Sequence, residues 1–305
     1  MKQYTSLYFV GAGGIGMSAL VRYFLAKGYK VAGYDRTQSP LTTELKTEGL
    51  EIVYEESVES IPDYCRNPET TLVVYTPAIP ASHAGLVYFR EHGFRVVKRA
   101  ELLGLITQSS KGLCFAGTHG KTTTSSMAAH IFHESPIGCN AFLGGILRNY
   151  NSNLILSEQS PFTVIEADEY DRSFHWLHPY MAVVTATDPD HLDIYGTEEA
   201  YLESFAHFTS LIQPGGCLIM KKGIKLVPSV KENVKIYTYS ARDGGDFHAG
   251  NIRIGDGTIV FDFVMPEGSV ADIELGVPVE INIENAVAAM AIAWLNGVSG
   301  DNLRR

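Results

Sequence analysis

The sequence predicts an α/β protein with two successive domains, and three observations support this prediction. Short apolar runs, which suit buried strands, alternate with longer patterns that suit helices. Two of these runs end in a glycine-rich turn that leads into a helical pattern, at residues 11–16 and 117–120. The chain has 305 residues, more than one hydrophobic core usually organises. We therefore expect a Rossmann-like parallel-sheet domain over residues 1–110, followed by a P-loop α/β domain with a small β extension over residues 111–305.

Composition and charge restrict the possible partners. Hydrophobic residues make up 45% and charged residues 19% of the chain, as in ordinary globular proteins. The formal net charge is −10 without a basic run, which argues against nucleic acid and membrane surfaces as partners. We find neither a signal peptide nor an apolar run of membrane-spanning length. The four cysteines are far apart and form no C-x-x-C pair, so we expect a reducing, cytoplasmic location. The oligomeric state stays open.

The first glycine-rich turn follows an apolar run, Leu7–Val10, and precedes a helical pattern that ends at Gly28. A second strand, Lys30–Tyr34, is followed by Asp35. This order matches G-x-G-x-x-G with an acidic residue about twenty positions later, the dinucleotide-binding fingerprint. A diphosphate could lie on the helix N-terminus while Asp35 accepts a hydrogen bond from a sugar hydroxyl. NAD fits this pattern, but so does any nucleoside diphosphate, and a packing turn without a ligand is the alternative.

The rest of the first domain continues the alternation of strands and helices. Later segments predict three strands, one helix, a loop at the ligand-binding edge of the sheet and a polar linker. These are, in the same order, residues 51–54, 71–75 and 95–98 for the strands, 85–92 for the helix, Thr76–Pro80 for the loop and Gln108–Lys111 for the linker.

The second glycine-rich turn predicts a phosphate-binding loop. A buried strand, Leu113–Ala116, leads through Gly117 and Gly120 to Lys121-Thr122 and a helical pattern. Glycines allow backbone N–H groups to face a polyphosphate, and the helix N-terminus adds partial positive charge. In such loops the lysine reaches the terminal phosphates and the threonine hydroxyl binds Mg²⁺. Phe115 occupies the position where the general pattern has its first glycine, so this loop is shorter. A plain strand-to-helix turn is the alternative.

Acidic residues and a histidine follow two later strands. The apolar run that begins at Phe162 leads into Glu166, Asp168 and Glu169, and we expect Glu166 to face inward with Asp168 next on the same face. Such carboxylates beside a phosphate loop suit a Mg²⁺-nucleotide site, whereas a solvated acidic loop is the alternative. His191 follows the strand at 181–185. Chemistry alone favours a phosphate or carboxylate contact for His191, because Mg²⁺ prefers oxygen ligands.

The remaining segments predict structural elements and one further contact. Residues 198–212 form an amphipathic helical pattern whose aromatic stripe belongs to the core. Short strand-like runs at 218–220, 235–239 and 259–264 predict the β extension. An alanine-rich helix over 282–294 opens with Asn282 and Asn285, one turn apart. Their amides could read the edge of an adenine, although Asn282 could instead cap the helix.

Five motifs in this order resemble the Mur ligases over essentially the whole chain, and the resemblance adds roles that spacing alone does not give. It implies an ATP-dependent amide-forming ligase of peptidoglycan precursor synthesis, with a UDP-sugar-binding domain followed by a P-loop ATPase domain. In such an enzyme, ATP phosphorylates the carboxylate of UDP-N-acetylmuramate, and the amine of L-alanine attacks the acyl phosphate. The motifs are Gly11-Ala-Gly-Gly-Ile-Gly-Met-Ser18, Ala116-Gly-Thr-His-Gly-Lys-Thr-Thr-Thr124, Glu166-Ala-Asp-Glu-Tyr-Asp171, Asp190-His-Leu-Asp193 and Asn282…Asn285.

The resemblance also assigns residues. It implies that Lys121 steadies the transferring phosphate, that Thr122 and Glu166 hold one Mg²⁺, and that His191 holds a second. This last role replaces the contact that chemistry alone favoured for His191. The ATP-binding residues would be Gly117, Thr118, His119, Gly120, Lys121, Thr122 and Thr123, with Asn282 and Asn285 at the adenine. The UDP-sugar-binding residues would be Gly13, Gly14, Ile15, Gly16, Met17, Asp35 and Thr76.

The sequence departs from the family pattern in several places. Tyr170, Ala186 and Ile281 stand where alanine-adding members commonly have Ser, Asn and His. Since no lysine lies between His191 and Lys221, the carbamylated lysine of later Mur ligases has no candidate. These ligases also have a third, C-terminal domain, and this sequence ends where we expect that domain to begin. We therefore expect a fragment that binds each ligand weakly and ligates poorly.

Three alternatives remain at this stage. Tyr170 favours the family member that attaches a recycled tripeptide, whereas Met17-Ser18 fits the alanine-adding members better. An NAD-dependent oxidoreductase explains residues 7–35 but gives the loop from Gly117 to Thr123 no role. A nucleotide-binding module without chemistry is the third alternative.

Overall fold

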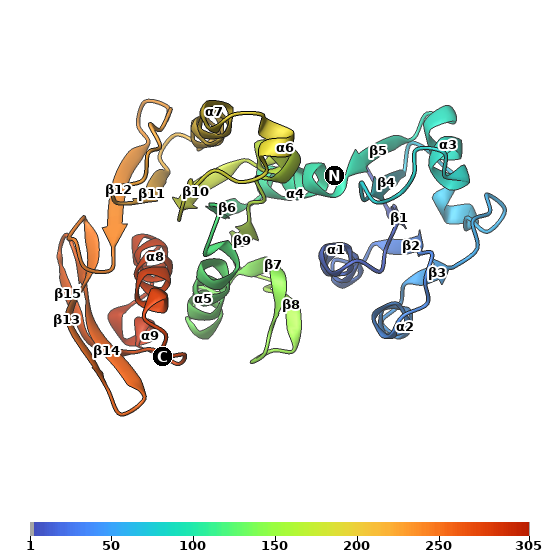
Figure 1. Cartoon of the computed structure of the whole chain (residues 1–305). Helices are drawn as coiled ribbons and strands as arrows, with labels where there is room; N and C mark the ends of the chain where they lie inside the picture. The colour runs from blue at the N-terminus through green and yellow to red at the C-terminus, as the bar shows by residue number, and fades with distance from the viewer. Residues whose placement is uncertain (1–2, 305) are drawn as a thin grey trace. The chain divides into compact units, whose positions relative to one another are not determined.

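The computed structural model describes residues 3–304, which divide into two compact units (Figure 1). Unit 1 comprises the chain up to Leu105 together with Gly144–Leu154, and unit 2 comprises Ile106–Leu143 and the chain from Ile155 onward. The sequence suggested a single crossing near residue 110. In the structure residues 144–154 also belong to unit 1, which the sequence did not predict.

Unit 1 contains a five-stranded parallel sheet in the order β3-β2-β1-β4-β5. Val10, the last residue of β1, pairs with Tyr34 at the end of β2 and with Tyr75 at the end of β4. The loops that begin at Gly11, Asp35 and Thr76 therefore leave the same edge of the sheet, where the strand order reverses. The strands are β1 (Ser6–Val10), β2 (Lys30–Tyr34), β3 (Glu51–Val53), β4 (Thr71–Tyr75) and β5 (Arg95–Lys98).

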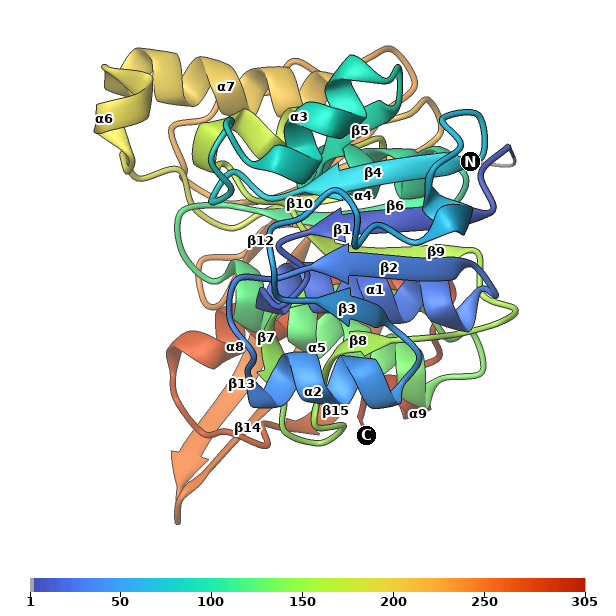
Figure 2. The same ribbon diagram turned by 90° about the vertical axis from the view of Figure 1, so that its right-hand side faces the viewer.

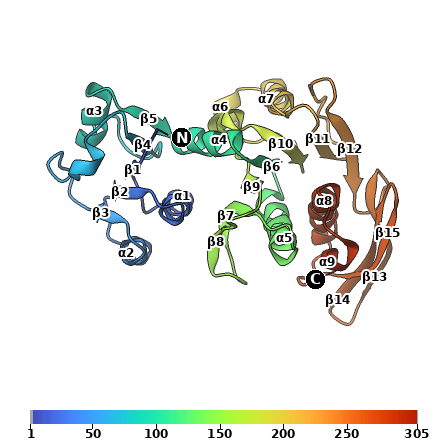
Figure 3. The ribbon, with the colours of Figure 1, turned by 180° about the vertical axis from the view of Figure 1, so that it is seen from behind.

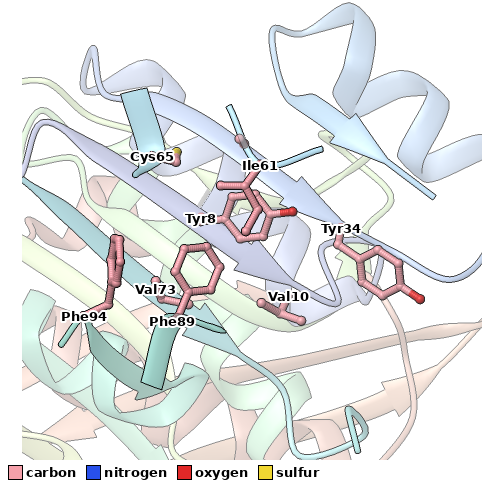
Figure 4. Close-up of a cluster of buried hydrophobic side chains, with 9 residues drawn as sticks. Tyr8, Val10, Tyr34, Ile61, Cys65, Val73, Phe89 and Phe94 are labelled. Atoms are coloured by element: carbon pink, nitrogen blue, oxygen red, sulfur yellow. The ribbon is translucent and has the colours of Figure 1, made fainter. Parts of the chain in front are cut away.

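Helices cover this sheet, and an aromatic cluster fills one of its faces. Alternate residues of β1, Tyr8 and Val10, pack with Phe89 and Phe94 in a buried cluster (Figure 4). The sequence missed two helices and predicted a linker that is too long, since the last helix runs to Gln108 and only two residues separate it from the next strand. The elements are α1 (Ile15–Ala26), α2 (Pro40–Thr47), η1 (Asp63–Cys65), α3 (Ala84–Glu91) and α4 (Arg99–Gln108).

The second sheet has ten strands within the described residues, in the order β15-β14-β13-β12-β11-β10-β6-β9-β7-β8 (Figure 1). Figure 2 instead shows the parallel strands β4, β1, β2 and β3 of the first sheet side by side. Parallel pairing runs from β7 through β9, β6 and β10 to β13, and β13–β15 then pair antiparallel. The predicted β extension is therefore a continuation of the main sheet. The strands are β6 (Lys111–Ala116), β7 (Asn140–Leu147), β8 (Ser152–Ile155), β9 (Phe162–Glu166), β10 (Pro179–Val184), β11 (Cys217–Lys221), β12 (Lys235–Ser240), β13 (Phe247–Gly255), β14 (Thr258–Met265) and β15 (Gly268–Glu274).

Two helices of unit 2, α5 and α8, lie side by side (Figures 1 and 3). The alanine-rich helix is buried along most of its length, because small side chains allow close packing. The aromatic stripe of α7 is core as predicted, since Tyr201, Phe205 and Phe208 are fully buried. The helices are α5 (Lys121–Glu134), η2 (Tyr170–Trp176), α6 (Leu192–Tyr195), α7 (Glu198–Ser210), α8 (Ile281–Leu295) and α9 (Gly300–Leu303).

Two further features concern the chain as a whole. Within residues 3–304, no helix combines the length and apolar character needed to cross a membrane. The four cysteines are free and buried. Burial raises the pKa of each of these thiols, so they behave as small apolar core residues.

Candidate functional site

The second glycine-rich turn lies where three parallel strands end together. Phe115 of β6 pairs with Glu166 of β9, and Ala116 pairs with Val184 of β10. Because parallel strands point the same way, the loops after these residues leave one edge of the sheet. The predicted phosphate loop and the first predicted carboxylate therefore lie on neighbouring strands.

Two glycines shape the loop, and both need to be glycine. Gly117 has φ +140°, and a Cβ there would lie 2.1 Å from the Thr185 hydroxyl oxygen. Gly120 has φ +83°, caps the N-terminus of α5, and would bring a Cβ to 2.9 Å from Asn285 Oδ1. Phe115, which occupies the glycine position of the longer pattern, is fully buried within β6. The loop is short because the strand continues through that position.

Hydroxyl groups fix the loop from the neighbouring chain segments. The Thr118 hydroxyl donates to the Asp188 carbonyl at 2.7 Å and lies 2.9 Å from the Tyr201 hydroxyl. The Thr185 hydroxyl is positioned to donate to the carbonyls of Ala116 and His119. Sequence reasoning missed Thr185 and Tyr201, since their roles depend on contacts between segments distant in sequence. His119 and Thr123 are exposed, and Thr123 lies in the first turn of α5.

Lys121 is held by a carboxylate that sequence reasoning did not select. Its ammonium donates to the Gly117 carbonyl at 2.7 Å and to Glu169 Oε1 at 2.9 Å. Glu169 is only 1% exposed. Burial raises the pKa of its carboxyl above the usual range, and the hydrogen bond and charge of Lys121 oppose this shift only in part. The loop lysine and Glu169 thus form a buried ion pair at the start of α5.

The structure corrects the expectation for Asp168. The side chain of Asp168 accepts a hydrogen bond from the Tyr170 N–H at 3.0 Å and is half-buried, whereas Glu169 points inward. The alternation of a strand predicted the opposite, but β9 ends at Glu166 and the chain then turns. The sequence signal for Glu169 is its position three residues after Glu166, just beyond the end of the strand.

Thr122 and Glu166 come together as predicted. The Thr122 hydroxyl donates to Glu166 Oε1 at 2.9 Å beside the first turn of α5. Within residues 3–304, no group of three or more His, Cys, Asp or Glu side chains could hold a metal. The pair of oxygens from Thr122 and Glu166 nevertheless fits Mg²⁺, which takes one or two protein oxygens and completes its shell with water and phosphate. A Zn²⁺ site would need more protein ligands.

His191 lies after β10, in a left-handed backbone conformation with φ +52°. Its backbone N–H donates to Asp190 Oδ1 at 2.7 Å, and its ring meets the Tyr170 ring edge to face at 5.2 Å. Tyr170 is 49% exposed. The residue that departs from the common Ser therefore contacts the predicted second metal ligand, whose metal role stays a prediction.

Of the two asparagines of α8, Asn285 contacts the first turns of α5 and Asn282 contacts Asn285. Asn285 Oδ1 accepts from the Thr124 hydroxyl at 3.2 Å, and its amide nitrogen donates to Asn282 Oδ1 at 3.2 Å. The amide of Asn282 donates to the Val277 carbonyl at 3.3 Å. Glu280 occupies the N-cap position of α8, so capping by Asn282 is ruled out. Contact with adenine stays a prediction for both residues.

In unit 1 the first glycine-rich turn lies where we expected it, but Asp35 makes hydrogen bonds within the turn that we did not expect. A Cβ on Gly11 would lie 2.6 Å from the Thr76 methyl group, so the two loops are in contact. Asp35 accepts from the Gly13 N–H at 2.7 Å and from the Thr37 N–H at 3.0 Å. Asp35 therefore shapes the glycine loop itself, in addition to any contact with a sugar hydroxyl.

The residues at the start of α1 that we expected to contact a ligand differ in their exposure. Gly14 is the N-cap, and Ile15 is 50% exposed beside Gly16 in the first turn. Met17 is 2% exposed, and its N–H donates to the Gly14 carbonyl at 3.0 Å. The side chain of Met17 therefore belongs to the core, and its contact with a ligand stays a prediction.

These features define a class: a P-loop α/β domain joined to a Rossmann-like domain with its own glycine-rich turn. Comparison with known families gives the assignment. Residues 115–293 match the Mur ligase middle domain, and residues 6–111 match the model described as Mur ligase family, catalytic domain. The chain belongs to the Mur ligase family.

Two curated relatives resemble the chain over almost all of its length. A protein of Parabacteroides distasonis is 66% identical over 100% of this chain and 66% of its own length. A protein of Phocaeicola vulgatus is 64% identical over 98% of this chain and 65% of its own length. Both are named UDP-N-acetylmuramate–L-alanine ligase. The chain thus spans about two thirds of the length of these relatives.

Two solved structures share the fold. The UDP-N-acetylmuramate–alanine ligase of Thermotoga maritima matches with a TM-score of 0.79 and 23% identity, covering 98% of this chain and 66% of that one. The UDP-N-acetylmuramate:L-alanyl-gamma-D-glutamyl-meso-diaminopimelate ligase of Neisseria meningitides matches with a TM-score of 0.83 and 21% identity, covering 98% of this chain and 96% of that one. At these identities the two matches establish the fold and not the substrate.

Proposed function

We propose that the chain provides the UDP-sugar and ATP modules of an ATP-dependent ligase that joins L-alanine to the carboxylate of UDP-N-acetylmuramate. The product is an amide, formed through an acyl phosphate, in the synthesis of peptidoglycan precursors. Relatives named for this reaction match at 64–66% identity, which supports the choice of substrate. We place the reaction in the cytoplasm, since four free, buried cysteines suit a reducing compartment.

The observation that carries the proposal is the contact between Thr122 and Glu166 at 2.9 Å, beside the Lys121 ammonium. An exposed hydroxyl, a carboxylate and an ammonium at a strand-to-helix turn are the protein groups that a Mg²⁺-nucleotide needs. Mg²⁺ would be held by Thr122 and Glu166 and would neutralise phosphate charge. Nucleotide and metal are both part of the proposal.

The residues of the chain would act mainly by positioning. The N–H groups at the start of α5 and the Lys121 ammonium would orient the terminal phosphate toward the muramoyl carboxylate. Gly117 and Gly120 allow the backbone to approach the phosphates, because a side chain at either position would collide with its neighbours. Phosphoryl transfer needs little covalent help from the protein, so fixed positive charge and alignment supply most of the catalysis.

Two alternatives are not favoured. The curated relatives named for alanine addition outweigh the single feature, Tyr170, that suggested addition of a recycled tripeptide. Membership of the Mur ligase family argues against an NAD-dependent oxidoreductase. In unit 1, Asp35 is already engaged by two backbone N–H groups. A nucleotide-binding module without chemistry of its own becomes an outcome of the test below.

The test measures binding and ligation separately. The chain itself should bind ATP in the presence of Mg²⁺, and Lys121→Ala should abolish that binding. The full-length protein that contains this chain should release ADP at roughly 1 per second or faster with UDP-N-acetylmuramate and L-alanine, and slowly with the tripeptide. Faster release with the tripeptide would identify the recycling activity. Nucleotide binding without amine-dependent ADP release would indicate a non-catalytic module.

A further inference from the structure

Arg99 lies at the ligand-binding edge of unit 1, although its place in the sequence gives no sign of this. It is the first residue of α4 and directly follows β5. Lys98, the last residue of β5, pairs with Tyr75 at the end of β4. Arg99 therefore leaves the sheet at the same edge as Gly11 and Thr76.

The guanidinium of Arg99 lies against the first turn of α1. A Cβ built on Gly16 would be 3.0 Å from Arg99 Nη1, 3.3 Å from its Cδ and 3.4 Å from its Cζ. A side chain at Gly16 would press against the guanidinium at these distances, so the glycine favours this approach. The third glycine of the fingerprint, usually explained by helix packing, here makes space for a cation.

The Arg99 guanidinium has no counter-ion within residues 3–304. The residue is half-buried, and its side chain makes no hydrogen bond or ion pair with the described residues. Asp35, at the same edge of the sheet, accepts from the Gly13 and Thr37 N–H groups. Glu101, on the same helix as Arg99, pairs with Arg95 at 3.2 Å. The partly exposed guanidinium is therefore free to bind an anionic ligand.

The first turn of α1 adds donors of its own. The N-cap, Gly14, makes no side-chain hydrogen bond, and the first turn contains no acidic residue. The first N–H groups of a helix have no partner within it, and they attract negative charge. Two sets of donors, the N–H groups of α1 and the guanidinium of Arg99, therefore lie next to each other.

We propose that Arg99 binds the diphosphate of a nucleoside diphosphate ligand together with the first turn of α1. A guanidinium offers two parallel N–H groups to phosphate oxygens, a geometry that a lysine cannot reproduce. The identity of the ligand as a UDP-sugar rests on the proposed function, but the role of Arg99 toward a diphosphate does not. Gly16 is the companion residue that allows the guanidinium to reach this position.

The experiment measures binding of UDP, UMP and uridine to the whole chain by calorimetry. Arg99→Ala should weaken UDP binding at least tenfold, weaken UMP binding less, and leave uridine binding unchanged. Arg99→Lys should be intermediate. Arg95→Ala, which removes a nearby arginine that already pairs with Glu101, is the matched control and should bind UDP normally. Equal UDP binding by wild type and Arg99→Ala, or an equal loss for uridine, would overturn the proposal.

Gly16→Ala separates binding from folding. Alanine favours the helix interior over glycine by about 1 kcal/mol, so this variant should be at least as stable as the wild type. Its methyl group would displace the guanidinium and weaken UDP binding, with uridine binding unchanged. If the wild type binds no uridine nucleotide, the first module of the proposed function fails. Inorganic pyrophosphate then tests Arg99 alone: binding that Arg99→Ala removes keeps the inference, and absence of binding ends it.

Discussion

The Lys121 ammonium and the Glu169 carboxylate form an ion pair at 2.9 Å, in which Glu169 is 1% exposed and the side chain of Lys121 is 15% exposed. The Lys121 ammonium also donates to the Gly117 carbonyl, and the backbone carbonyl of Glu169 accepts from the Tyr195 hydroxyl. The lysine of the phosphate loop is therefore joined to the turn after β9. The pair gives Lys121 a structural role beside its proposed contact with phosphate.

Removing Lys121 should destabilise unit 2 even without nucleotide. Lys121→Met keeps most of the packing but leaves a buried carboxylate without its counter-ion, and we expect a loss of about 3 kcal/mol in the free energy of unfolding. Both tryptophans, Trp176 and Trp294, lie in unit 2, so their fluorescence in urea follows this unit. Adding Glu169→Gln should restore most of the loss, because the buried charge disappears. Strictly additive effects of the two changes would contradict this coupling.

The loop needs glycine at position 117 chiefly because a side chain would collide with its neighbours, and less because of the positive φ. Gly117→Ala would place a methyl group 2.1 Å from the Thr185 hydroxyl oxygen and 2.8 Å from the Ala186 nitrogen. We expect a loss of about 3 kcal/mol or more in the stability of unit 2, and loss of ATP binding.

Gly223→Ala is the control for this variant. Gly223 also has a positive φ, +85°, but nothing lies within 4 Å of a Cβ built there. It should therefore cost only the backbone strain, about 1 kcal/mol, and leave ATP binding intact. Equal losses in the two variants would show that strain alone, and not the collision with Thr185, explains the need for glycine.

The proposed Mg²⁺ ligands make a prediction that does not require ligation. Glu166→Gln should reduce the enhancement of ATP binding by Mg²⁺ about tenfold, because a neutral amide is a poorer ligand for a hard cation than a carboxylate. ATP binding without Mg²⁺ should change little. The measurement is titration of a fluorescent ATP analogue with and without Mg²⁺.

Asp168→Asn supplies the comparison for Glu166→Gln, two residues further along. The amide oxygen of Asn can still accept the bond from the Tyr170 N–H, so the local turn should persist. Normal enhancement by Mg²⁺ is expected. A similar loss in both variants would mean that net charge near the loop, and not direct ligation by Glu166, controls the effect.

The parts of this protein that could be predicted from sequence depend on local patterns. Apolar runs predicted β1, β2, β4 and β5 nearly to the residue, and glycine spacing located both glycine-rich turns at strand-to-helix junctions. The contact between Thr122 and Glu166 could be predicted because parallel strands end at a common edge. That residues 144–154 belong to unit 1 could not be predicted, because no local sequence pattern indicates it.

Three site residues escaped prediction for identifiable reasons. Glu169 follows the end of β9, where strand alternation no longer applies, and that alternation predicts an inward side chain at Asp168 instead. Arg99 meets Gly16 across the sheet edge, which is a contact that only the fold creates. Thr185 looked like the last residue of a strand, yet its hydroxyl supports the neighbouring loop through Ala116 and His119.

The last prediction concerns His83 in unit 1, a histidine that is 5% exposed. Its Nδ1 accepts from the Leu86 N–H at 3.3 Å as the N-cap of α3, and its buried Nε2 has no hydrogen-bond partner within residues 3–304. Burial lowers the pKa of the imidazole below its usual value, despite the opposing charge of Glu56. The neutral form is therefore the one that the folded state prefers.

The sign of the pH effect follows from this lowered pKa. An unfolded chain takes up a proton on His83 near pH 6.5, whereas the folded chain resists protonation until lower pH. The stabilisation is complete above about pH 6.5 and is lost as the pH falls through the folded pKa. His83→Asn keeps a capping side chain but does not titrate. Hydrogen exchange of α3 should show opening free energies that fall from pH 7.5 to pH 5.5 in the wild type and stay nearly level in the variant. His92→Asn, at the exposed C-terminal end of α3, should keep the wild-type slope. A wild-type slope in His83→Asn would assign the acid sensitivity to other groups.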